Sequence, residues 1–126
     1  MVHILISGFL SQESDKVEEW AEMVATMKGS EAYAISWESN TSANFQSFLM
    51  ESVKNVMGGT KISEEYRKIS KDNPFNEALD NARITGRIFA ELVVRLFPNQ
   101  FISLCGFSLG SLIIQEFLYR MIHLNQ

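Results

Sequence analysis

Residues 106–110, Gly-Phe-Ser-Leu-Gly, constrain the fold of this chain more than any other segment, because they join two apolar runs. The run before them, 100–105, indicates a short buried strand, and the run that follows, 108–124, indicates a helix. Gly-x-Ser-x-Gly between a strand and a helix is typical of a sharp turn, in which the serine has a strained backbone and the small residues let strand and helix pass closely. We therefore expect a tight turn at Ser108, with the helix packed back on a sheet.

Two further apolar runs, 2–7 and 32–37, indicate strands. They lack the polar alternation of a strand with one wet face, as expected in a buried parallel sheet. Helical patterns cover about 15–28, 42–57 and 74–97, with a mostly polar helical connection at about 58–73. Strands separated by helices predict a three-layer α/β fold, with flanking helices and a short parallel sheet in the order 2-1-3.

The composition fits one small globular domain. The 126 residues are 46% hydrophobic, so we expect a single domain, 1–126, that needs no disulfide or metal to hold its core. The 11 basic and 15 acidic residues form no basic cluster, which argues against nucleic acid and anionic lipid as partners. No apolar run reaches the length of a transmembrane helix, and the first residues do not resemble a targeting signal.

Several conspicuous residues have sufficient structural explanations. The single cysteine, Cys105, lies in an apolar strand, so we expect it to pack as a small hydrophobe in an intracellular, reducing compartment. Asp15 has the spacing of a helix cap, and the two tryptophans are expected to be core or interface anchors. The acidic pairs are interpreted as solvated surface and the glycine pair as a helix stop: Glu18 with Glu19, Glu64 with Glu65, and Gly58 with Gly59. No spacing of ligands indicates a metal or a cofactor.

The turn itself has the parts of an acyl-transfer site. Ser108 is the candidate nucleophile, since a serine on such a turn is exposed at the end of the sheet. The backbone N–H of Leu109, at the helix N-terminus, is a candidate oxyanion donor, and a second donor is expected from Phe9 or Leu10 after the first strand. An alternative is a small flavodoxin-like binding domain whose turn only holds an anion at the helix N-terminus.

A histidine and an acid to activate Ser108 are not found at suitable positions. In this type of site the chain order is serine, acid, histidine, and only Glu116 and His123 follow Ser108, both on the same helix. Fifteen residues of helix place His123 about 22 Å from Ser108, against the ~3 Å that proton transfer requires. His3 lies in the first strand, roughly 15 Å from the turn. A serine without a base is a poor nucleophile.

Four sequence blocks extend the similarity beyond the pentapeptide. They occur in the order HILISGFLSQESDKVEEW, EAYAISWES, NPFNEALDNARITGRIFAELV and ISLCGFSLGSLIIQEFLYRM. Together they resemble the transmembrane and coiled-coil domain protein 4 family of α/β-hydrolases over nearly the whole chain, most specifically from Asn73 to Gly110. The resemblance implies that Ser108 matches the nucleophile and that Gly8, Phe9 and Leu10 match the oxyanion loop.

The resemblance also implies what this chain lacks. The chain covers only the amino-terminal half of that hydrolase domain, so the fold is expected to be a truncated α/β-hydrolase fold. Further strands bear the acid and the histidine in the family. The family carries a hydrophobic, membrane-associated insertion between the WES and NPF blocks, whereas the same interval here is mostly polar.

These observations predict an α/β-hydrolase-like protein that is not catalytic alone and acts as a structural or assembly subunit. An unpaired apolar edge is a site of association, so we expect a protein partner or a second copy beside residues 100–105 and the 108–124 helix. The alternative is a serine esterase or lipase present as a fragment or as one piece of a split enzyme, with the remaining triad residues elsewhere.

Overall fold

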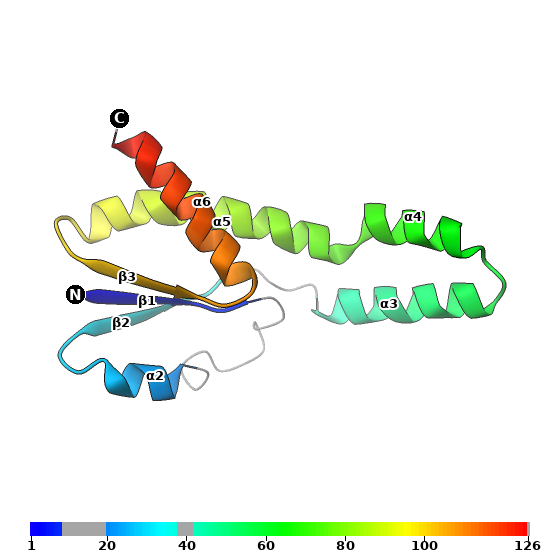
Figure 1. Cartoon of the computed structure of the whole chain (residues 1–126), viewed down its shortest axis with the longest axis horizontal. Helices are drawn as coiled ribbons and strands as arrows, with labels where there is room; N and C mark the ends of the chain where they lie inside the picture. Colours follow the sequence, from blue (N-terminus) through cyan, green and yellow to red (C-terminus); the bar gives the residue numbers. More distant parts are fainter. Residues whose placement is uncertain (9–19, 38–41, 126) are drawn as a thin grey trace.

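The computed structural model describes residues 1–8, 20–37 and 42–125, which form three strands and five helices (Figure 1). In chain order these are β1 (Val2–Ile6), α2 (Ala21–Thr26), β2 (Glu31–Ile35), α3 (Ser42–Met57), α4 (Ile62–Asp72), α5 (Pro74–Leu96), β3 (Ile102–Gly106) and α6 (Leu109–Leu124). The alternation of strands and helices confirms the predicted α/β class.

The sheet is parallel throughout and has the predicted order, β2-β1-β3. At its carboxyl end Ile6 of β1 lies opposite Ile35 of β2 and Gly106 of β3. Helices α5 and α6 cover one face of the sheet and α2 lies over the other (Figure 1). All three strands therefore end at the same edge, where the turn at Ser108 begins.

The core lies between the central strand and the α5–α6 layer. Val2, Ile4 and Ile6 of β1 are almost fully buried, because alternate side chains of this strand point toward the two helices. Asn73 begins α5 by accepting a hydrogen bond from the backbone N–H of Phe75 at 2.9 Å. Six small or apolar residues then bury one face of α5: Ala78, Ala82, Gly86, Phe89, Ala90 and Val93.

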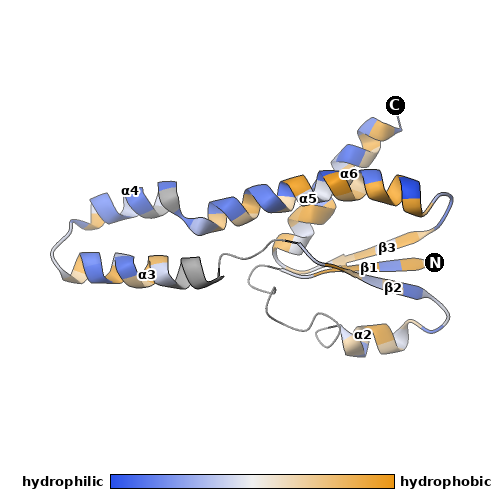
Figure 2. Ribbon diagram, turned by 180° about the vertical axis from the view of Figure 1, so that it is seen from behind, coloured by the Kyte–Doolittle hydropathy of each residue, from blue (hydrophilic) through white to orange (hydrophobic). Residues whose placement is uncertain are grey.

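Helices α3 and α4 form a hairpin that projects beside the sheet, away from α2 and α6 (Figures 1 and 2). The polar connection predicted at 58–73 is largely helix α4, and Lys68 binds Glu51 of α3 at 2.8 Å. This contact holds the pKa of the Glu51 carboxyl below its usual range.

The prediction that Glu65 is solvated surface is wrong. Its side chain is buried between α3 and α4 and accepts a hydrogen bond from Nδ2 of Asn55 at 3.3 Å. The hairpin geometry makes the difference, because the inner face of α4 includes Glu65 whereas the neighbouring Glu64 is exposed.

Two helices differ from their predictions. Helix α2 ends at Thr26, and the expected helical residues 15–19 lie outside the described residues. The apolar circumference of α6 predicts burial on more than one side, yet Leu118 and Ile122 are more than half exposed. None of the helices among the described residues is long and apolar enough to cross a membrane.

Candidate functional site

Ser108 has the strained backbone that the sequence predicts. Its φ is 54° and its ψ is −122°, in a region that residues with a Cβ atom rarely adopt. Such a conformation costs on the order of 1–3 kcal/mol and persists only where the surrounding structure imposes it. The strand-to-helix turn is therefore confirmed as a backbone feature, and the role of Ser108 as a nucleophile remains a prediction.

The glycines on either side of Ser108 allow strand and helix to pass closely. A Cβ atom on Gly106 would lie 2.7 Å from the carbonyl oxygen of Gly110. A Cβ atom on Gly110 would overlap the carbonyl oxygen of Ile6, at the end of the central strand. Because both neighbours are backbone atoms, neither can move aside cheaply, and the two glycines are required by space rather than by a special φ.

Backbone hydrogen bonds fix the turn on both sides of Ser108. The N–H of Phe107 donates to the carbonyl oxygen of Ile6 at 3.1 Å, and the N–H of Gly110 donates to Phe107 at 2.9 Å. The N–H of Ser111 donates to the carbonyl oxygen of Ser108 at 3.0 Å. Leu109 is the first residue of α6, where N–H groups have no acceptor within the helix. The role of this N–H as an oxyanion donor stays a prediction.

The chain leaving β1 lies directly against the turn. A Cβ atom on Gly8 would lie 2.7 Å from Cβ of Ser108 and 2.8 Å from the carbonyl oxygen of Phe107. The resemblance assigns Gly8 to an oxyanion loop, and the structure places this residue beside Ser108. The other two residues of that loop, Phe9 and Leu10, lie outside the described residues.

Two tryptophans meet at the residue before Gly8. Nε1 of Trp37 donates to the carbonyl oxygen of Ser7 at 2.8 Å, and Nε1 of Trp20 donates to Oγ of Ser7 at 3.1 Å. Ser7, Trp20 and Trp37 are all buried. The prediction that both tryptophans are core or interface anchors agrees with their burial, but their common partner was not predicted. The available signal was their position, since each lies near the carboxyl edge of the sheet.

Neither of the two histidines in the sequence lies near Ser108. His123 is exposed near the carboxyl end of α6, opposite the end that begins at Ser108. His3 is paired with Ala32 and Ser103, three residues before the end of β1.

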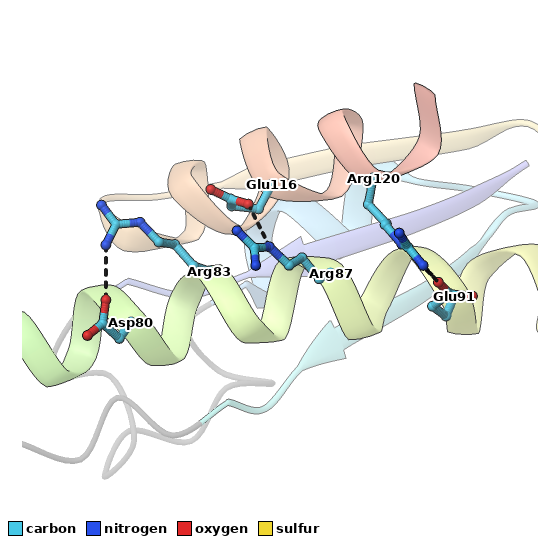
Figure 3. Close-up of polar contacts among 6 residues, drawn as sticks. All are labelled: Asp80, Arg83, Arg87, Glu91, Glu116 and Arg120. Atoms are coloured by element: carbon cyan, nitrogen blue, oxygen red, sulfur yellow. Dashed lines mark hydrogen bonds and ion pairs between the residues drawn. The ribbon is translucent and has the colours of Figure 1, made fainter. Parts of the chain in front are cut away.

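Glu116, the acid that follows Ser108 in the sequence, takes part in a structural contact. Its carboxylate accepts from Nε of Arg87 on α5 at 3.1 Å (Figure 3). A second ion pair between the same helices joins Arg120 to Glu91, and Arg83 pairs with Asp80 along α5. Arg87, Glu116, Arg120 and His123 also line a surface hollow of about 440 Å³ together with Tyr119. Glu116 therefore serves the α5–α6 packing.

Cys105 is the single cysteine of the chain, and the sequence predicts that it packs as a small hydrophobe. Cys105 is half-buried in β3 as a free thiol, in line with a packing role. Within the described ranges, no three histidine, cysteine or acidic side chains are grouped so that they could hold a metal ion.

No family model, curated protein or solved structure matches the chain.

Proposed function

We propose that this chain is an α/β-hydrolase-like assembly subunit of the kind suggested by its resemblance to the transmembrane and coiled-coil domain protein 4 family. It presents a nucleophile elbow at Ser108 and is not catalytic by itself. The observation that carries the proposal is the strained backbone of Ser108, φ 54° and ψ −122°, in a chain whose two histidines both lie far from it. A histidine base for Ser108 would have to come from outside residues 1–126, because both histidines of the sequence lie in the described part of the chain and away from Ser108.

The surface around β3 supports an assembly role. In the part of the chain that the structure describes, no strand pairs with the outer edge of β3. Phe101 before this strand is 84% exposed and Phe107 after it is 67% exposed. Figure 2 shows that β3 is hydrophobic along its length. An apolar edge strand without charged residues pairs readily with another chain, and the partner is either a second copy or a different protein.

The alternative is that the chain is one piece of a split serine esterase or lipase. The strain at Ser108 favours this alternative over a purely structural role, because strained residues cluster at sites where the conformation is part of the mechanism. In both versions the chain alone is inert, and they differ in whether the completed assembly reacts through Ser108.

We expect the isolated chain to self-associate through the exposed apolar surface of β3 and α6. The double variant Phe101→Lys/Ile122→Lys should lower the mass measured by light scattering to that of a monomer, because both side chains are exposed and apolar. Ile88→Lys is the matched control: Ile88 is 55% exposed, against 56% for Ile122, but it lies on α5 beside Ile35 of β2. A wild-type chain that is a stable, soluble monomer would contradict self-association and leave only a different protein as the partner at this surface.

A further inference from the structure

Both tryptophans of the chain donate their indole N–H groups to one residue, Ser7. Trp37 follows β2 and bonds to the Ser7 carbonyl oxygen at 2.8 Å, and Trp20 precedes α2 and bonds to Oγ of Ser7 at 3.1 Å. Ser7 is 1% exposed, Trp37 is 4% exposed and Trp20 is 9% exposed. Apolar packing alone would be satisfied by a phenylalanine at either position, whereas two buried N–H groups directed at one residue fix the position of that residue.

The position of Ser7 is transmitted to Ser108 through a single residue. Gly8 follows Ser7, and the space at its Cα is so limited that an added Cβ would lie 2.7 Å from Cβ of Ser108. The same added atom would lie 2.8 Å from the carbonyl oxygen of Phe107. A shift of Ser7 and Gly8 would therefore move the backbone atoms against which the Ser108 turn is packed.

The strained backbone of Ser108 has to be held in place by contacts with neighbouring residues. A residue with φ of 54° relaxes unless its neighbours hold it. On one side the N–H of Phe107 is bound to Ile6, and on the other side Gly8 packs against the Ser108 side chain.

We propose that Trp20 and Trp37 are positioning residues for Ser108, which act through Ser7 and Gly8 to keep the Ser108 side chain at the N-terminus of α6. The inference rests on the proposed role of Ser108 as the nucleophile position. The two tryptophans touch neither a substrate nor the reacting atoms. Trp37 contributes more than Trp20, because its bond to the Ser7 carbonyl oxygen is shorter and restrains the backbone directly.

The test uses a thiol as a reporter, because a thiolate reacts without a histidine base. In the Cys105→Ser/Ser108→Cys chain the new thiol is the only one, and its rate of alkylation by iodoacetamide is measured against pH. A thiol held at a helix N-terminus has a pKa below the ordinary value of about 8.5. We expect Trp37→Phe to raise this pKa by about one unit, which lowers the thiolate fraction at pH 6 about tenfold and slows alkylation about threefold, because a thiolate of higher pKa is more nucleophilic.

The other variants separate the two bonds. Trp20→Phe and Ser7→Ala each remove the bond to the Ser7 hydroxyl, so both should raise the pKa of the thiol by the same smaller amount. The double variant Ser7→Ala/Trp20→Phe should then shift the pKa by less than the sum of the two single shifts, since both changes remove the same bond. Val93→Ala, in the same core and distant in sequence from the turn, is the control for destabilisation without loss of an indole bond.

The outcomes are distinguishable. Suppose that the thiol in the reporter chain has a lowered pKa, and that Trp37→Phe shifts it no more than Val93→Ala does. This result would overturn the positioning inference and leave the proposed role of Ser108 intact. An ordinary thiol pKa in the reporter chain itself would contradict both the inference and the placement of Ser108 at an activating helix N-terminus. Selective shifts in the tryptophan and Ser7 variants support the inference, whatever the thermal stability of those variants.

Discussion

Gly110→Ala is expected to prevent stable folding of the chain, with a loss of more than about 3 kcal/mol in the free energy of unfolding. The added methyl group would overlap the carbonyl oxygen of Ile6, and Ile6 is completely buried in the central strand. Relief would require the first turn of α6 to move away from β1. That movement would also break the bond from the Phe107 N–H to Ile6. Far-UV circular dichroism and urea unfolding measure the loss.

Ser108→Gly is the matched control for Gly110→Ala in the same turn. Glycine adopts positive φ without a Cβ penalty, so this change should raise the free energy of unfolding by about 1 kcal/mol. Opposite signs for two substitutions two residues apart would show that the turn is set by close backbone approach at Gly110 and by strain at Ser108. A Gly110→Ala chain as stable as wild type would contradict the packing of α6 on β1.

Gly86→Ala should have the second-largest effect, a loss of about 2–3 kcal/mol. Gly86 lies where α5 crosses α6, and an added Cβ would lie 2.5 Å from the carbonyl oxygen of Ile113. It would also lie 2.7 Å from Cβ of Glu116, so the two helices would have to separate. Helix propensity alone predicts the opposite sign, because alanine in a helix is about 1 kcal/mol more favourable than glycine. The sign of the change therefore decides between packing and propensity.

Thr85→Ala is the control for Gly86→Ala, because it changes the neighbouring residue, which lies with Ile88 on the side of α5 near Ile35. We expect a change within about 0.5 kcal/mol for this variant. Urea unfolding of both variants, followed by tryptophan fluorescence, provides the comparison. A stabilised Gly86→Ala chain would mean that α5 and α6 are not in close contact at this point.

The sequence predicts the sheet and the turn because both are local signals. Apolar β-branched runs mark the strands, and short alternation with helices leaves few topologies, among which the parallel order β2-β1-β3 is favoured. The glycines at 106 and 110 predict that strand and helix pass closely, and the structure shows this close approach. The glycine at 86 has no such motif around it, so its role at the α5–α6 crossing could not be predicted.

Contacts between segments that are distant in the sequence could not be predicted, for a physical reason. Trp20 and Trp37 are separated from Ser7 by 13 and 30 residues, and no periodicity encodes which backbone atom a buried indole N–H will reach. The burial of Glu65 depends on how α4 folds against α3, and a polar sequence indicates only that a helix is amphipathic. The ion pairs of Arg87 and Arg120 likewise follow from the crossing of α5 and α6 (Figure 3).

The exposed apolar surface of β3 and α6 is the region at which we propose that a partner binds. Phe101 and Phe107 flank β3, Leu118 and Ile122 lie on α6, and all four side chains are exposed to solvent. Phe107 is the residue next to Ser108, so a partner that extends along this surface as far as Phe107 would also lie beside the proposed site. Association and completion of the site are therefore expected to be one event in the split-enzyme version of the proposal.

Intact mass spectrometry of the purified chain after incubation with a fluorophosphonate probe measures whether Ser108 is activated within this chain. Ser108 lies in a strained strand-to-helix turn and neither histidine of the sequence is near it, so the wild-type chain should remain unlabelled, as the Ser108→Ala control does. Stoichiometric labelling that is confined to Ser108 and absent from Ser108→Ala would contradict the account, because it would mean that the isolated chain activates its own serine.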